Sequence, residues 1–123
     1  MGRSLLGALA PEELDRFLTR AHIRALTPYT VTDPMRIKAI VRTDRGNGWS
    51  FVRREQAEIG CSLGVPLRDR SGSIVAALGT GWYSRSEEAD EARRAEILPH
   101  LLHAADEINR ALLKGNYDAR GIA

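Results

Sequence analysis

Residues 61–82 have the sequence CSLGVPLRDRSGSIVAALGTGW, which carries the strongest structural signal in the chain. Two runs rich in apolar residues, Cys61–Arg68 and Ser73–Trp82, flank the turn-forming residues 69–72, DRSG. Two such runs separated by turn formers are typical of a β-hairpin. We therefore predict two antiparallel strands joined by a tight turn.

The two faces of this predicted hairpin differ in side-chain size. Side chains alternate between faces along a strand, so one face carries the bulkier apolar residues Leu63, Val65, Leu67, Ile74, Ala76 and Leu78. The other face carries Ser62, Gly64, Pro66, Ala77, Gly79 and Gly81. The bulky face is suited to packing against a helix. The small-residue face either leaves room for a small molecule or lets another part of the backbone approach closely.

Two helices are predicted at the start of the chain. A short first helix carries on one side the residues Leu5, Leu6 and Leu9. A second helix, Pro11–Ala21, has helical spacing in its apolar stripe of Leu14, Phe17, Leu18 and Ala21. Both helices should bury these stripes against the rest of the domain.

A third helix and a short strand are predicted between residues 33 and 53. Asp33 followed by Pro34 is typical of a helix start. Glycine favours helix ends, so this helix should end at Gly46 or Gly48. The residues that follow, Trp49–Arg53, are aromatic-rich and predict a short strand.

A long helix is predicted after the hairpin. Ser84 and Ser86 are both candidate N-caps, and Ser84 with Glu87 would form a capping box. The helix should present one apolar stripe, formed by Leu98, Leu101, Leu102, Ala105, Ile108 and Leu112. Pro99 cannot donate a backbone hydrogen bond, so we expect a kink or a break there. Gly115 should close the helix.

The order of these elements predicts the fold class. Helices come first, then three strands in sequence, then a helix, which is typical of an α+β domain with an antiparallel sheet. Three strands are few for a 123-residue domain. We therefore expect a sheet that is incomplete or is completed by a partner chain. We expect one domain over residues 1–115 and a tail over residues 116–123.

Composition excludes several classes of protein. Lys plus Arg number 18 and Asp plus Glu 16, so the net charge of +2 does not indicate general nucleic-acid binding. No apolar run is long enough to span a membrane. The N-terminus lacks a signal-peptide pattern, and the single cysteine excludes an internal disulfide. These observations favour a cytoplasmic protein.

Few residues are suited to catalysis or metal binding. Cys61 has no base or orienting group in its sequence context, which favours a small apolar strand residue over a nucleophile. His100 and His103 lie three apart on the predicted helix, but no third metal ligand is near them in the sequence. We therefore predict no metal and no cofactor.

Three motifs along the chain match one known family. They are MGRSLL at residues 1–6, LTPYTVTD at residues 26–33 and the run at residues 59–78. In this order they resemble the C-terminal effector-binding domain of the IclR-type transcriptional regulators, and most of all the regulators of aromatic-acid catabolism through the β-ketoadipate route. The resemblance extends from Met1 to about Leu113.

The resemblance implies a fold and a partial domain. The effector-binding domain of this family is a GAF-like or profilin-like antiparallel sheet, with helices packed on one face and a small-molecule pocket on the other. The full regulators carry a winged helix-turn-helix domain before it and bind operator DNA as dimers or tetramers. Neither that domain nor the first strands of the effector domain occur in this sequence, so we expect a partial domain.

The resemblance also implies ligand-binding residues. The backbone amides at Met1 and Gly2 would receive the carboxylate of the effector, and Ser62 corresponds to the family's pocket residue on the first hairpin strand. Gly79 and Gly81 stand where the family has two polar residues, and Cys61 stands where it has arginine. These departures favour a bulkier ligand, such as an aromatic acid. A further hypothesis is that Arg53, at a position often acidic in the family, pairs with that acid.

We therefore expect a domain that performs no chemistry. It would bind a small organic acid and control operator binding by a linked domain. It would also self-associate as a dimer or tetramer, through its long helix or its exposed sheet edge. The alternative is a stand-alone sensory or protein-interaction module of GAF or profilin type without DNA binding. A small enzyme that uses Cys61 is the third class, and it is the least favoured.

Overall fold

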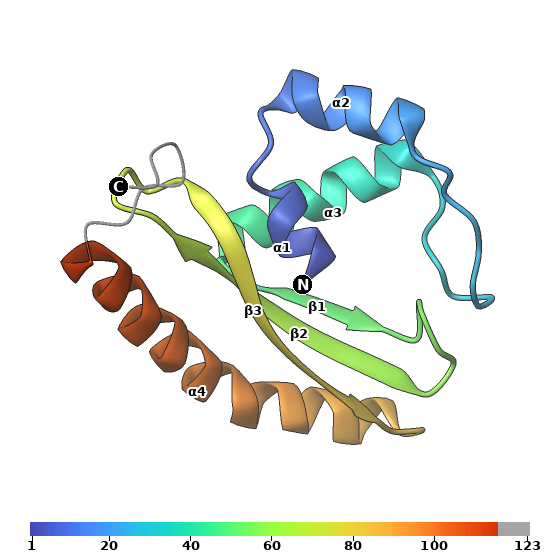
Figure 1. Ribbon diagram of the computed structural model, residues 1–123. Coiled ribbons are helices and arrows are strands. Elements are labelled where there is room, and N and C mark those ends of the chain that lie inside the picture. Colours follow the sequence, from blue (N-terminus) through green and yellow to red (C-terminus); the bar gives the residue numbers. More distant parts are fainter. Residues whose placement is uncertain (116–123) are drawn as a thin grey trace.

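A computed structural model of the protein describes residues 1–115 and shows a three-stranded sheet with helices (Figure 1). Its elements are α1 (Gly2–Leu6), α2 (Pro11–Arg20), α3 (Pro34–Asn47), β1 (Ser50–Arg53), β2 (Gly60–Arg68), β3 (Ile74–Tyr83) and α4 (Glu87–Lys114). The strand order is β1-β2-β3 and both pairings are antiparallel. The predicted α+β class is confirmed. The predicted tail, residues 116–123, lies outside the described residues.

The hairpin of β2 and β3 forms where the sequence predicts it. The pairing runs from Gly60 opposite Tyr83 to Arg68 opposite Ile74. The carboxylate of Asp69 accepts hydrogen bonds from the backbone amides of residues 71 and 73, at 2.9 and 3.1 Å. Gly72 has φ +84°, a left-handed conformation that favours glycine. Local turn chemistry therefore fixes the register of the two longest strands.

The ends of α3 also agree with the sequence analysis. The Asp33 carboxylate accepts a hydrogen bond from the Met35 amide at 3.2 Å, which caps the first turn. Gly48, and not Gly46, ends the helix, with φ +82°. A residue with a β-carbon would be strained in this left-handed conformation.

The start and course of α4 correct two expectations. Ser86 is the N-cap and accepts a hydrogen bond from the Ala89 amide at 3.2 Å. Ser84 instead accepts from the Ser86 amide at 3.2 Å, so the predicted Ser84–Glu87 capping box does not form. The helix is continuous through Pro99, so the expected break is wrong, and the alternative of a kink stays a prediction. Proline removes one hydrogen bond, whereas packing of the apolar stripe against the sheet holds the helix on both sides of it.

The main core lies between the bulky face of the sheet and α4, as predicted. Ile74 is the exception: the register shift between Leu67 and Arg68 places it opposite Arg68, on the other face, where it lines a small hollow with Pro66. Leu63 and Val65 of β2 are fully buried and pack against Leu101 and Ala105 of α4. Partly buried residues that surround them are Trp49, Phe51, Leu67, Leu78, Trp82, Ile97 and Leu98. Burial of each large aliphatic side chain contributes about 1.5–3 kcal/mol. This face of the sheet is therefore a packing surface.

A second, smaller cluster joins the first three helices. It is centred on Leu14 and Leu18 of α2 and Val41 of α3. Leu6, Leu9, Ile23 and Ile37 pack around it. The predicted stripe of α2 is thus confirmed in part, because Phe17 remains 48% exposed. The cluster makes α1, α2 and α3 one layer.

This helical layer lies on the small-residue face of the sheet, opposite α4 (Figure 1). The structure therefore differs from the expected arrangement with helices on one face only. A β-carbon built on Gly64 would lie 3.0 Å from the Met1 backbone nitrogen, and one on Gly79 would lie 2.5 Å from the Met1 Cγ. The two glycines permit α1 to approach the sheet, so close backbone packing accounts for the middle of this face.

A buried carboxylate joins the sheet to the start of α4. Asp90 is fully buried, and its two oxygens accept hydrogen bonds from Arg53 Nε at 2.7 Å and Trp82 Nε1 at 3.1 Å. Arg53 pairs with Cys61, and Cys61 pairs with Trp82, so these three residues lie side by side across β1, β2 and β3. One side chain of α4 thus contacts a single row that crosses the whole sheet.

Asp90 should make the stability of the domain depend on acid pH. Burial alone would raise the pKa of Asp90, but the hydrogen bonds from Arg53 and Trp82 outweigh it and lower the pKa to about 2. Because the folded pKa lies below the unfolded one, the stabilisation is complete at neutral pH. It is lost as the pH falls from about 4 through about 2.

We predict that Asp90→Asn lowers the free energy of unfolding at pH 7 by about 3 kcal/mol, because it leaves the Arg53 charge without its buried partner. Urea denaturation between pH 2 and 7 would measure this loss. The difference between wild type and variant should shrink at the acid end. A constant difference across the range would contradict this role for Asp90.

Candidate ligand-binding site

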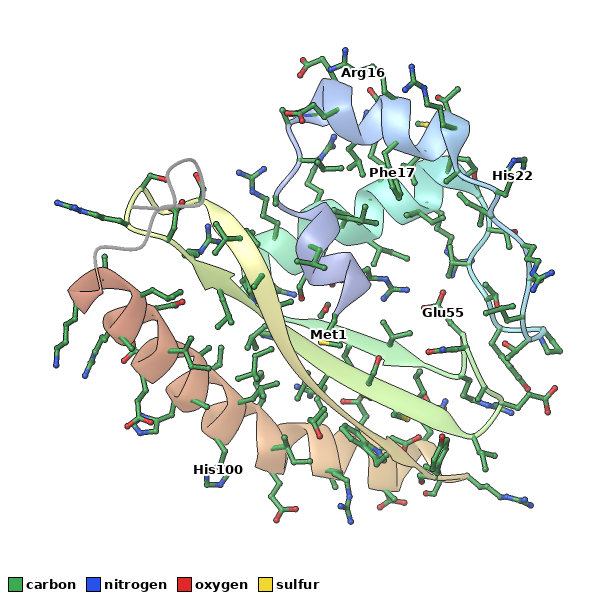
Figure 2. All side chains as sticks on the ribbon, viewed as in Figure 1. Met1, Arg16, Phe17, His22, Glu55 and His100 are labelled. Atoms are coloured by element: carbon green, nitrogen blue, oxygen red, sulfur yellow. The ribbon has the colours of Figure 1, made fainter. Side chains whose placement is uncertain are left out.

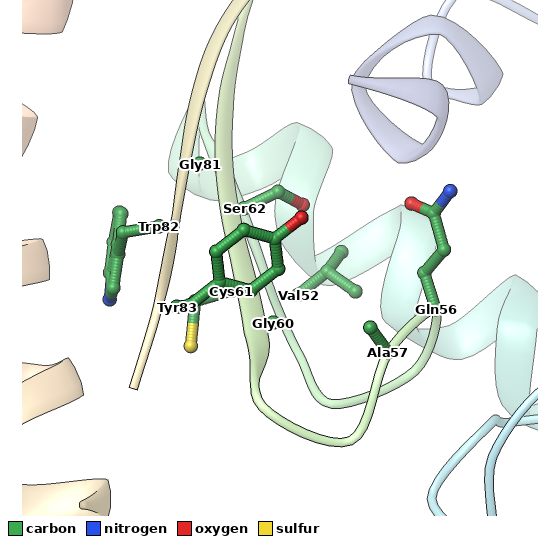
Figure 3. A pocket seen from close by; sticks show the side chains of 9 residues that line it. All are labelled: Val52, Gln56, Ala57, Gly60, Cys61, Ser62, Gly81, Trp82 and Tyr83. Carbon is green, nitrogen blue, oxygen red and sulfur yellow. The ribbon is translucent and has the colours of Figure 1, made fainter. Parts of the chain in front are cut away.

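Two adjoining hollows lie on the small-residue face, beside α1. The larger has a volume of about 550 Å³ (Figure 3) and is lined by Val52, Gln56, Ala57, Gly60, Cys61, Ser62, Gly81, Trp82 and Tyr83. The smaller has a volume of about 400 Å³ and is lined by Met1, Gly2, Gln56, Ser62, Leu63, Gly79, Thr80 and Gly81. Gln56, Ser62 and Gly81 line both hollows. We refer to the pair as the sheet-face site.

Strand register explains why these residues meet. Val52 of β1 pairs with Ser62 of β2, and Ser62 pairs with Gly81 of β3. Their side chains therefore share one face of the sheet, one row away from the pairing of Gly64 with Gly79 that α1 covers. The absence of a side chain at Gly81 keeps the hollow open beyond α1.

The side chains that line the sheet-face site carry no charge. Its polar side chains are Gln56, Ser62 and Tyr83, and no Asp, Glu, Lys, Arg or His lines either hollow within residues 1–115. The remaining walls are glycine, aliphatic and aromatic. Such a surface is suited to a mainly apolar ligand with a few polar groups, which amides, hydroxyls and backbone groups would orient.

Five of the residues predicted from the sequence meet at this site. Met1, Gly2, Ser62, Gly79 and Gly81 come from α1, β2 and β3, and all of them line one or both hollows. The structure thus brings the start of the chain together with the hairpin of β2 and β3. Their contact with a ligand remains a prediction.

Arg53 and Cys61 are placed differently. Arg53 lines neither hollow, because its guanidinium donates to Asp90 on the α4 face. The hypothesis that Arg53 pairs with an acid ligand therefore has no support in the geometry. Cys61 contributes to the wall of the larger hollow but is buried in the same row as Arg53.

Several lining residues were not predicted from the sequence. Strand alternation and pairing could have identified Val52, because it lies opposite Ser62. Gln56 and Ala57 lie in an irregular segment between β1 and β2, where no periodicity indicates which side chains face the site.

The histidines do not form a metal site. His100 projects from α4 away from the sheet, and His22 lies on the other side of the molecule beyond α2 (Figure 2). His103 lies 3.5 Å from Glu107 on the exposed surface of α4. Within residues 1–115 no three His, Cys, Asp or Glu side chains are grouped as metal ligands. No helix in this part of the chain has the length and apolar character needed to cross a membrane.

The sequence has relatives among known proteins. The family described as "Bacterial transcriptional regulator IclR C-terminal" matches residues 1–110. The Pca regulon regulatory protein of Pseudomonas putida is 33% identical over 108 residues, which are 88% of this chain and 37% of that protein. The chain therefore spans little more than a third of that relative.

Solved structures show the same fold. A transcriptional regulator of Rhodococcus sp. RHA1 superposes with a TM-score of 0.85 and 30% identity, over 93% of this chain and 46% of that one. The C-terminal domain of the E. coli regulator KdgR gives 0.80 and 25%, over 91% and 67%. A PobR inducer-binding domain from Acinetobacter, a double mutant in complex with 3-hydroxybenzoic acid, gives 0.81 and 24%, over 88% and 63%, and its likeness concerns the fold alone.

Cys61 should be a slow nucleophile. Burial and a hydrogen bond with the Asp90 carboxylate raise the pKa of the Cys61 thiol from 9.0 to about 11. At pH 8 the folded chain should therefore react with iodoacetamide about a hundredfold more slowly than the urea-unfolded chain. Mass spectrometry would measure the rate of alkylation. Equal rates in the folded and the unfolded chain would contradict this placement of the thiol.

Proposed function

The chain belongs to the IclR C-terminal family of bacterial transcriptional regulators, and on that basis we propose that it is a non-catalytic ligand-sensing domain. It binds a small organic acid, specifically an aromatic acid, in the sheet-face site. Binding controls the attachment of a linked winged helix-turn-helix domain to operator DNA, in the cytoplasm.

The sheet-face site is the observation that carries this proposal. Volumes of about 400 and 550 Å³ suit a ligand with one aromatic ring and its polar substituents. The ring would lie over Gly81, beside the Met1 side chain that covers Gly79. Its carboxylate would be held by the backbone at Met1 and Gly2 and by the Ser62 hydroxyl, because the lining offers no cationic side chain.

Signalling requires that the ligand favour one arrangement of the domain over another. Met1, the N-cap of α1, touches the sheet at Gly64 and Gly79, and Leu6 of the same helix packs in the cluster of α2 and α3. A ligand seated against Met1 therefore acts on the whole helical layer. Because the chain spans 37% of its curated relative, operator binding belongs to the complete regulator.

A second candidate function, a protein-interaction module without DNA binding, is favoured by the edge of the sheet. β3 is an edge strand of ten residues and contains no charged residue and no proline. Edge strands usually carry such residues, which prevent pairing with another chain. Two copies of β3 could pair antiparallel without bringing like charges together. We propose that the chain self-associates through this edge.

The ligand proposal predicts that 3-hydroxybenzoate binds the wild-type chain, as measured by isothermal titration calorimetry. Ser62→Leu places a bulky side chain in the wall shared by both hollows, so it should weaken binding at least about tenfold. Thr19→Leu, on the exposed surface of α2, is the matched control and should bind like wild type. Unchanged binding by the Ser62 variant, or no binding by wild type, would contradict the proposal.

The edge proposal predicts a dimer in sedimentation equilibrium. Thr80→Lys adds a charge to β3 at an exposed position, so like charges would oppose strand pairing and the variant should be monomeric. Thr19→Lys makes the same change on α2 and should leave the dimer intact. A wild-type monomer, or a dimer that both variants retain, would count against the β3 edge.

A further inference from the structure

The segment between β1 and β2, residues 54–59, forms a wall of the sheet-face site without belonging to the sheet. Gln56 lines both hollows and Ala57 lines the larger one. Arg54 has φ +64°, a left-handed conformation that costs free energy in a residue with a side chain. A wall of this kind keeps its shape only if other contacts hold it.

The motif at residues 26–33 supplies part of that support. The Thr27 hydroxyl donates to the Arg54 carbonyl at 2.5 Å, and the Thr30 hydroxyl donates to the Glu55 carbonyl at 2.6 Å. The Arg54 guanidinium lies 3.7 Å from the centre of the Tyr29 ring. The motif at residues 26–33 lines neither hollow. Its contacts give it a different role, because its side chains hold the backbone of the 54–59 wall.

The Glu55 carboxylate joins this support to α1. One oxygen accepts a hydrogen bond from the Val31 amide at 2.9 Å, and the other pairs with the Arg3 guanidinium. The side chains of Arg3 and Glu55 are only 15% and 18% exposed. Arg3 also donates to the Phe51 carbonyl of β1 at 3.3 Å. A charge-assisted pair in such a position is worth more than an exposed one, because solvent screens it less.

The Arg3–Glu55 pair lies next to two walls of the site, α1 and the segment 54–59. Arg3 directly follows Gly2, which with Met1 lines the smaller hollow, and Glu55 directly precedes Gln56, which lines both. Glu55 and Met1 lie on the same side of the sheet (Figure 2). Glu55 itself is absent from the lining of either hollow. The pair therefore sets the distance between the two walls without occupying the site.

We propose that Glu55 is the positioning residue of the sheet-face site. It holds the 54–59 wall at a fixed separation from α1 and thereby fixes the size of the ligand the site accepts. This inference rests on the proposed function for its ligand, although the contacts on which it depends do not involve one.

The test compares three variants of the full chain. Glu55→Ala removes both contacts of the carboxylate. Glu55→Gln removes the ion pair with Arg3 and keeps an oxygen that can accept from Val31. Glu58→Gln makes the same change of charge at an exposed residue of the same segment and is the matched control. Each is measured by titration with 3-hydroxybenzoate and, without any ligand, by amide hydrogen exchange.

Without ligand, Glu55→Ala should speed amide exchange at Val31 and at residues 56–60, and leave exchange at Leu63 and Val65 unchanged. Its affinity for 3-hydroxybenzoate should fall about tenfold. Glu55→Gln should keep slow exchange at Val31 and lose part of the affinity, and Glu58→Gln should match wild type. A merely structural role would speed exchange at Leu63 and Val65 as well.

Two results would overturn the inference: exchange in Glu55→Ala that matches wild type at Val31 and residues 56–60, or affinity for 3-hydroxybenzoate that all three variants retain. If wild type does not bind 3-hydroxybenzoate, the proposed aromatic-acid function fails. The exchange measurement then still decides whether Glu55 holds the wall.

Discussion

The arrangement of the domain depends on the burial of one carboxylate, Asp90. A buried charge is costly unless it is paired and hydrogen-bonded. Asp90 meets this requirement with Arg53 and Trp82, which lie in one row with Cys61 across the three strands. These contacts fix the start of α4 against the sheet. The apolar stripe of the helix then packs on Leu63 and Val65. Because α4 covers this face of the sheet, the sheet-face site lies on the opposite face.

The same constraint shapes the chemistry of the site. Arg53 is held by Asp90 on the α4 face, and no cationic side chain of the strands lines the sheet-face site. What remains there is glycine, hydroxyl and amide, with α1 closing over Gly64 and Gly79. A hollow lined by uncharged side chains, next to a layer of helices, fits a sensor, whose ligand must be bound and released.

The sequence predicts the local features well, because their causes are local. The hairpin turn, the Asp33 cap and the two faces of the strands each depend on residues within a few positions of one another. The ligand role of Arg53 could not be judged in the same way, because its partner lies 37 residues away. Gln56 was missed since an irregular segment has no periodicity. The contact of α1 with Gly64 and Gly79 could not be predicted either, because it joins segments that lie far apart in the sequence.

We propose that this domain binds an aromatic acid on the small-residue face of its sheet. The most direct test is the ¹H–¹⁵N spectrum of the chain during titration with 3-hydroxybenzoate. We expect the shifts to concentrate at Gln56, Ser62, Gly79 and Gly81 and to saturate at a common ligand concentration. Shifts concentrated on the exposed surface of α4, or a spectrum that does not change, would contradict it.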